Sequence, residues 1–217
     1  MTVQSPPKAN REVPSGIEAI QFFFEFASPY SYIASLEIDE VAASAGRSVE
    51  WRPIELASVW AEHGVLEAYT ATRRLKRPYI LRDAVRCANA KGIAMARPSA
   101  PATDTSLAKL AYWGLRHADA PLAKRFLQSV WHSYFGEGKP IGALEDLADA
   151  AAAVNLGALQ IQVAAAWAGA RQAQDQSNSD AERSGCFGVP WFIADGECFF
   201  GQDRLGQLAA HVKSRAD

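Results

Sequence analysis

The chain has 217 residues, of which 49% are apolar, so it can bury a sizeable core as one domain or as one domain with an insertion. Its 22 Lys and Arg side chains nearly balance 24 Asp and Glu, and a net charge of -2 argues against nucleic acid or an anionic membrane as a partner. No run reaches the ~18 apolar residues that a membrane span needs. We therefore predict a cytoplasmic protein with neither kind of partner.

Residues 1–16 are rich in proline, serine and charge and lack the apolar core of a signal peptide, so we expect a flexible N-terminal extension. A strand follows. Ile20, Phe22, Phe24 and Phe26 alternate with less apolar neighbours, which predicts one strongly buried face.

The strand stops at Ser28, which suits a helix N-cap, and Pro29 suits the first helical position. Apolar residues at helical spacing then predict a helix that ends at Gly46. Ser28 would stand at the positive end of a helix and at the carboxyl end of a strand, where open α/β sheets place ligands. A serine that only caps the helix is the alternative.

Residues 47–54 predict a second strand, parallel to the first. Strand signals then vanish until residue 189. Helical periodicity predicts helices over residues 78–91, 106–117, 122–135, 144–154 and 159–170, and a polar helix from 171 to about 184. Because the flanking strands must pair with each other, this segment has to leave and return on one side, and we expect it to lie as a lid beside Ser28.

The last part of the chain predicts a loop, a hairpin and a final helix. Gly188-Val189-Pro190 precedes two apolar runs that are joined by Asp195-Gly196, a hairpin turn signal. Together with the early strand, helix and strand, this is the plan of a thioredoxin-like fold, in which the Val-Pro bond is cis and faces the first helix. The predicted class is α/β, with an all-helical insertion between the βαβ and ββα halves. The expected thioredoxin-like domain comprises residues 17–57 and 185–217, and the insertion residues 58–184.

The three cysteines lie far apart in the sequence and form no Cys-x-x-Cys pair. Ser28 and Ser31 stand where a thiol–disulfide oxidoreductase of this fold carries its two cysteines, so a dithiol mechanism there is not available. Cys186, near the Val-Pro loop, is either structural or reactive, and the structural role is favoured. The four histidines have no metal-site spacing, and we predict no metal.

Three segments carry a resemblance to a known family: residues 26–32 (FASPYSY), 188–190 (GVP) and 200–204 (FGQDR). In order and spacing they resemble the 2-hydroxychromene-2-carboxylate isomerases and the related kappa-class glutathione transferases, within the DsbA-like branch of thioredoxin folds. Residues 61–65 and 100–105 depart from the family pattern, and whether His63 and Asp104 replace pocket residues there is left open.

The resemblance implies glutathione as the cofactor. The backbone of Val189, before Pro190, would pair with the cysteinyl unit as an added strand does, and the thiol would face the catalytic Ser28. Gln202 and Asp203 would bind the γ-glutamyl end, although Asp203 could instead only cap the last helix.

The glycyl carboxylate needs a cation. Family membership points to Lys76, in a basic cluster at residues 73–77, for which a solvated turn is the alternative.

The implied activity is glutathione-dependent isomerisation of 2-hydroxychromene-2-carboxylate to trans-o-hydroxybenzylidenepyruvate, by reversible thiolate addition to a conjugated double bond. The substrate partner would be a small aromatic carboxylate, and relatives suggest a homodimer. Two alternatives stay open: a kappa-like transferase, and a DsbA-like protein that binds thiols or peptides without the redox cysteine pair.

Overall fold

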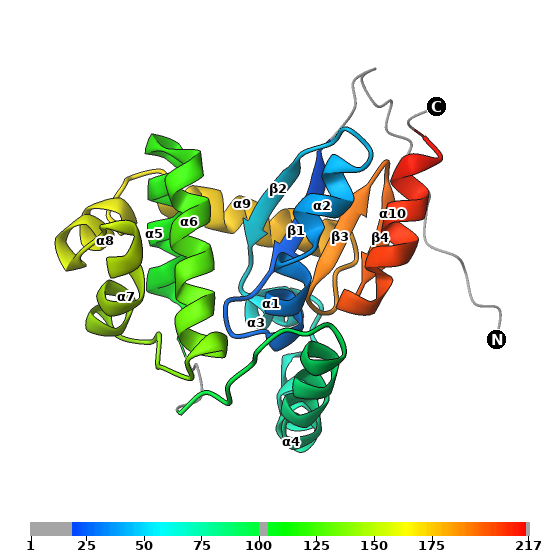
Figure 1. Cartoon of the computed structure of the whole chain (residues 1–217), viewed down its shortest axis with the longest axis horizontal. Helices are drawn as coiled ribbons and strands as arrows, with labels where there is room; N and C mark the ends of the chain where they lie inside the picture. Colours follow the sequence, from blue (N-terminus) through cyan, green and yellow to red (C-terminus); the bar gives the residue numbers. More distant parts are fainter. Residues whose placement is uncertain (1–18, 100–103, 216–217) are drawn as a thin grey trace.

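The computed structural model describes residues 19–99 and 104–215, so the expected extension over residues 1–16 lies outside the described part (Figure 1). Four strands form one sheet in the order β2-β1-β3-β4. They are β1 (Ile20–Phe24), β2 (Val49–Pro53), β3 (Trp191–Ala194) and β4 (Glu197–Phe200). β1 runs parallel to β2 and antiparallel to β3, and β3 and β4 form the predicted hairpin. The thioredoxin-like α/β class is confirmed.

The helices lie around this sheet and, for the most part, between β2 and β3 in the chain. They are α1 (Pro29–Ser35), α2 (Ile38–Ala43), α3 (Leu56–Glu62), α4 (Leu66–Ala90), α5 (Ser106–Ala118), α6 (Ala120–Trp131), α7 (Leu144–Ala151), α8 (Ala158–Ala165), α9 (Ala170–Arg183) and α10 (Leu205–Lys213). A π-helical turn, His132–Gly136, extends α6, and 3-10 turns occur at Ala152–Val154 and Gln202–Arg204.

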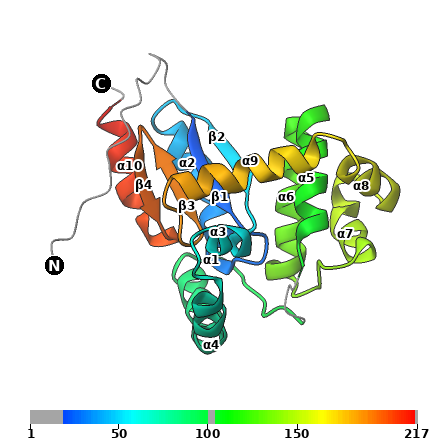
Figure 2. The ribbon, with the colours of Figure 1, turned by 180° about the vertical axis from the view of Figure 1, so that it is seen from behind.

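Both faces of the sheet are buried, which corrects the expectation of one buried face. Phe22 and Phe24 pack into the main core with α1, α2 and α10. On the other face, Phe23 lies fully buried in a second core to which α3 and α9 contribute Val59 and Ala181. Figure 2 shows α9 and α3 on that side of the sheet. The period-2 alternation did not predict the second buried face, because helices cover a thioredoxin-like sheet on both sides.

The first helix is broken where the sequence predicts one continuous helix to Gly46. α1 ends at Ser35, and α2 begins at Ile38 after a turn. The Ser35 hydroxyl donates to the Tyr32 carbonyl at 2.6 Å, so it competes for the backbone acceptors of the last turn of α1. Gly46 has a φ of 65° and closes the second segment, as predicted.

α4 begins twelve residues earlier than the predicted helix over residues 78–91, which corrects that boundary. Pro78 lies inside the helix and not at its start. The basic cluster at residues 73–77 is therefore helical and not a turn. Prolines favour first turns, so the sequence alone places the start at Pro78.

The helical segment divides between two places, so the expected lid is only part of it. α4 packs against α1, at the end of the sheet where Ser28 lies. α5, α6, α7 and α8 gather beside the β2 edge, and α9 returns from them across the sheet (Figure 1). The boundaries of the two predicted domains stay a prediction.

Within the described residues no single helix is long and apolar enough to cross a membrane. Among these residues, one sharply bent pair, Leu144–Val154 and Ala158–Ala165, reaches the required length and composition when the two helices are taken together.

Candidate functional site

The strand register brings the sequence-predicted segments to one end of the sheet. Phe23 pairs with Trp191, so the chain before β3 passes beside the chain that follows β1. Trp191 also pairs with Phe200, which brings the segment after β4 to the same end. Three segments therefore meet at the carboxyl end of β1: the start of α1, the Val-Pro loop and the 3-10 turn Gln202–Arg204. Open α/β sheets bind ligands at this end of their strands.

Ser28 is the N-cap of α1. Its backbone is extended, with φ of -91° and ψ of 114°, and its Oγ accepts a hydrogen bond from the Ser31 N–H at 3.2 Å. The cap uses one acceptor lone pair, so the half-buried hydroxyl keeps its proton available for a second partner. Capping and a chemical role are thus compatible at this residue.

Ser31 occupies the next turn and differs from Ser28 in access. It is fully buried, and its Oγ has no hydrogen-bond partner within the described residues. Of the two serines at these positions, only Ser28 can reach a ligand.

The Val189–Pro190 peptide bond is cis, as the fold plan predicts. The Pro190 carbonyl accepts from the Gly201 N–H at 2.9 Å, which fixes the loop to the segment after β4. Across the residues that the structure describes, neither the N–H nor the C=O of Val189 has a hydrogen-bond partner. An extended peptide could use this donor and acceptor.

Gln202 and Asp203 lie in the 3-10 turn that contacts α1. Gln202 is buried, and its Oε1 has no partner among the described residues, so this turn holds an unused acceptor. Asp203 is exposed and pairs with Arg204 at 2.8 Å. No side chain caps the turn or α10, so Asp203 does not act as a helix cap.

α4 contacts the start of α1 through Asp83. The Tyr30 hydroxyl of α1 donates to Asp83 at 2.8 Å, and Arg86 binds the same carboxylate at 2.7 Å. The Arg86 and Tyr30 bonds lower the pKa of Asp83. Burial and then Asp83 raise the pKa of Tyr30, so the phenol stays protonated. The sequence places Asp83 within the predicted helix over residues 78–91 but does not indicate its tyrosine partner on α1.

Lys76 is exposed on α4, seven residues before Asp83. Seven residues are two helical turns, so Lys76 shares the face of Asp83, about 10 Å along the axis. Lys76 thus lies along the site and not at its centre, and its predicted contact with a ligand stays a prediction.

The sequence model of the DsbA-like thioredoxin domain matches residues 19–213. The chain belongs to this family. A curated relative named 2-hydroxychromene-2-carboxylate isomerase, from Sphingobium xenophagum, is 26% identical over 90% of this chain and 98% of the relative. A protein of Caenorhabditis elegans named glutathione s-transferase kappa 2 is 24% identical over 88% of this chain and 90% of its own.

A solved structure of a 2-hydroxychromene-2-carboxylate isomerase is similar in fold to this DsbA-like domain. The TM-score is 0.77 at 22% identity, with 91% of this chain and 95% of that chain covered. The predicted resemblance of the chain to the 2-hydroxychromene-2-carboxylate isomerases and kappa-class glutathione transferases, within the DsbA-like branch, is therefore confirmed.

None of the three thiols of this DsbA-like domain has the lowered pKa that thiol chemistry at the site would need. All are free, and Cys186 is fully buried, where burial raises its pKa to about 12. Burial also raises the pKa of Cys87 and Cys198. Among the described residues no group of His, Cys, Asp and Glu side chains could hold a metal ion.

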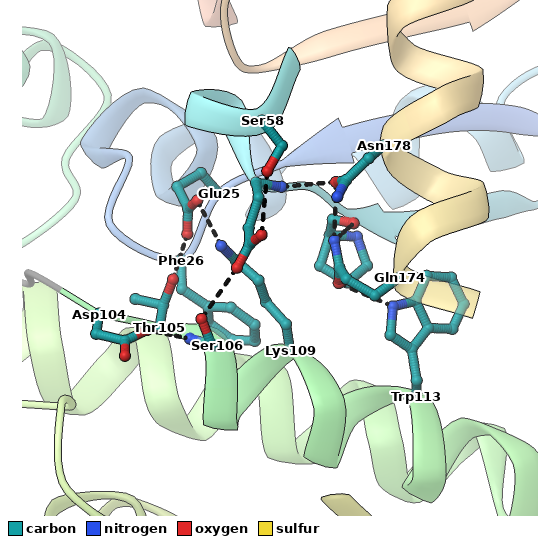
Figure 3. Close-up of polar contacts among 12 residues, drawn as sticks. Glu25, Phe26, Ser58, Asp104, Thr105, Ser106, Lys109, Trp113, Gln174 and Asn178 are labelled. Atoms are coloured by element: carbon teal, nitrogen blue, oxygen red, sulfur yellow. Dashed lines mark hydrogen bonds and ion pairs between the residues drawn. The ribbon is translucent and has the colours of Figure 1, made fainter. Parts of the chain in front are cut away.

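A buried ion pair that the sequence does not predict supports the end of β1. Glu25 binds Lys109 of α5 at 2.7 Å, and the Thr105 hydroxyl donates to the same carboxylate at 2.6 Å (Figure 3). The side chains of Lys109 and Glu25 are only 4% and 14% exposed. Since the Glu25 carbonyl also accepts from the Ser28 N–H at 2.9 Å, the pair anchors the turn that presents Ser28.

Hydrogen bonds among uncharged polar side chains and Glu55 form a network beside this pair that joins α3, α5 and α9 (Figure 3). Glu55 accepts from Ser58 at 3.2 Å and from Ser106 at 2.9 Å, and its N–H donates to Asn178 at 2.8 Å. The Gln174 Nε2–H donates to the Asn178 Oδ1 at 3.0 Å, which adds Gln174 to the network. In this DsbA-like domain the helical segment is thus held to the sheet by specific polar contacts near the site.

Proposed function

We propose that this protein is a glutathione-dependent isomerase of small aromatic carboxylates, and that it converts 2-hydroxychromene-2-carboxylate to trans-o-hydroxybenzylidenepyruvate. The observation that carries the proposal is the half-buried Ser28 hydroxyl at the start of α1, at the same end of the sheet as the unpaired backbone of Val189. The isomerase names of relatives that span nearly the whole chain support the reaction class.

The residues at the site suit glutathione. The free N–H and C=O of Val189 match the backbone of a cysteinyl unit, and the orphaned Gln202 Oε1 and the Asp203 carboxylate match an α-ammonium. Lys76, exposed on the same face of α4 as Asp83, would bind the glycyl carboxylate. These assignments give a partner to the γ-glutamyl ammonium, the cysteinyl backbone and the glycyl carboxylate of the tripeptide.

Glutathione, when bound, would supply a thiolate that can add reversibly to a conjugated double bond and so allow rotation about that bond. Ser28 would hold that sulfur in its charged form, because its free O–H can donate while the helix N-terminus contributes partial positive charge. No thiol of the chain is suited to replace it, since burial raises the pKa of Cys186 to about 12 and also raises the pKa of Cys87 and Cys198. Ser28 is not a nucleophile in this scheme, because the described residues around it include no hydrogen-bonded histidine.

The test is to follow the ultraviolet spectrum of the chromene acid with enzyme alone, with glutathione alone and with both. Turnover should require both, and glutathione should be recovered unchanged. Equal rates with and without glutathione would end the cofactor assignment. Failure of any substrate to turn over, with saturable glutathione binding retained in calorimetry, would end only the isomerase assignment.

A glutathione transferase is the second candidate, favoured by the relative named glutathione s-transferase kappa 2. The same site could deliver the thiolate to an electrophile that does not release it. Mass spectrometry of the products separates the two functions, since a transferase consumes one glutathione per turnover. No saturable glutathione binding would favour instead a DsbA-like protein that binds peptides without turnover.

A further inference from the structure

A groove of about 560 Å³ lies between α4 and the segment that follows it, outside the glutathione assignments. Pro78, Leu81 and Val85 of α4 form one wall, and Met95 and Pro98 form the other. Its surface is almost wholly apolar, and its volume is in the range of small-molecule sites, about 300–1,000 Å³.

The wall opposite α4 is held by backbone hydrogen bonds. α4 ends at Ala90, and Gly92, which follows the C-cap Lys91 and has a φ of 69°, lets the chain turn back. The Ala96 N–H then donates to the Phe135 carbonyl at 2.6 Å, and the Ser99 N–H donates to the Gly138 carbonyl at 2.8 Å. These bonds fix the segment to the turn after α6, so contacts within the chain hold the wall of the groove in place.

Three arginines, Arg82, Arg86 and Arg97, contribute to the lining, and because the surface is almost wholly apolar it is their aliphatic stems that face the groove. Arg86 is neutralised by Asp83, but Arg82 and Arg97 are exposed, and neither has an acidic partner within the described residues. They come from opposite walls, one from α4 and one from the following segment. In a chain with more acidic than basic residues, 24 against 22, this is a local concentration of positive charge.

We propose that this groove binds a small aromatic carboxylate at a site separate from Ser28. An apolar floor suits a ring system, and guanidinium groups bind carboxylates through paired hydrogen bonds while their planes stack on aromatic rings. Met95 adds a thioether, which packs favourably against ring edges. An aliphatic acid would gain the charge contact but neither kind of ring contact.

Arg86 gives the groove a connection to the site. It lines the groove, stacks on Tyr79 at 5.4 Å and binds Asp83, which in turn accepts from Tyr30 of α1. A carboxylate that drew Arg86 into the groove would loosen Asp83 beside the start of α1. Binding at the groove does not depend on the proposed reaction, so the two stand or fall separately.

The test is calorimetric titration of the full chain with 2-naphthoate, 2-naphthamide and decanoate, combined with amide chemical-shift mapping. We expect naphthoate to bind most tightly and to shift residues 78–86 and 93–98. Arg82→Gln and Arg97→Gln should each weaken naphthoate binding at least about ten-fold. Arg171→Gln, an exposed arginine on α9, is the matched control and should leave the affinity unchanged, as should Ser28→Ala.

Three results would overturn the proposal. Equal affinity for naphthoate and the uncharged naphthamide would remove the role of the arginines. Decanoate binding as well as naphthoate would remove the aromatic preference. A dimer in sedimentation that Leu81→Gln dissociates, with no naphthoate binding, would make the groove a contact between two copies of the chain.

Discussion

At the scale of the residue, the Ser28 hydroxyl can cap a helix and still have a proton to offer a ligand. Its Oγ lone pair caps α1 through the Ser31 N–H, and its own proton remains available. Lone-pair acceptance and proton donation use different parts of one hydroxyl. A cap therefore does not argue against a chemical role.

Ser28→Ala is expected to lower kcat by about 10²-fold while glutathione affinity changes little, because one donor to the developing charge is lost and the other contacts remain. The pKa of the bound thiol should rise toward its reference value near 8.5, so the pH profile of the rate shifts upward. Rate profiles and calorimetry measure both effects. Loss of the cap also costs about 1 kcal/mol in the free energy of unfolding. Unchanged activity would leave Ser28 as a cap alone.

Ser31→Ala is the matched control, one turn further along α1. The Ser31 hydroxyl is buried without a partner in the described part of the chain, so its removal should leave the free energy of unfolding unchanged or raise it. Activity should stay near that of the wild type. A loss as large as that of Ser28→Ala would mean that the effect comes from helix packing.

At the scale of the element, the Glu25–Lys109 pair joins the end of β1 to α5 across more than eighty residues of chain. Lys109→Met leaves a buried carboxylate without its cation, so we expect the free energy of unfolding to fall by roughly 3–5 kcal/mol. The double variant Glu25→Gln/Lys109→Met should recover much of that loss. Urea denaturation of the wild type, the two single variants and the double variant gives the coupling energy between Glu25 and Lys109. If the stability losses of the two single variants simply add in the double variant, the pair does not have this role.

α5 and α8 touch at Gly114, where a glycine is required by close approach. A Cβ at this position would lie 1.9 Å from the Ala164 carbonyl oxygen, so the two backbones leave no room for a side chain. Gly114→Ala should therefore destabilise the protein by about 1–3 kcal/mol or more, read from urea midpoints.

Gly206→Ala in α10 is the matched control for Gly114→Ala, because a Cβ there meets nothing within 4 Å. It should be neutral or stabilising by up to about 1 kcal/mol, since alanine is the better helix former. A similar loss in both variants would show that glycine flexibility, and not the contact between α5 and α8, matters.

At the scale of the whole molecule, two carboxylates link distant elements and make stability depend on acid. The Arg47 hydrogen bond lowers the pKa of Asp195, and the Arg86 and Tyr30 bonds lower that of Asp83. The unfolded chain therefore takes up these protons first as the pH falls. Their contribution is fully present above the unfolded value of about 3.9 and is lost as the pH drops through the folded values.

We expect urea midpoints to be nearly constant from about pH 7 to pH 5 and to decline below about pH 4. Asp195→Asn should flatten that decline, and asparagine tolerates the φ of 52° at this turn. A decline of the same steepness in this variant would show that Asp195 does not contribute.

Local pattern predicted most of the fold. The strand before Ser28, the Asp195-Gly196 turn and the polar helix after residue 170 follow from spacing and turn chemistry over a few neighbouring residues, and the structure has each of them. The start of α4 was missed because Pro78 resembles a helix start, and packing against the rest of the domain overrides that preference.

The sequence by itself determined the order of elements, the serine at the start of the first helix and the absence of a cysteine pair, because these are properties of neighbouring residues. Only the tertiary structure decided that Phe23 is buried on a second face, that Lys109 is an interior cation and that two arginines border an apolar groove. Burial and pairing depend on partners that are distant in the chain, so local spacing does not specify them.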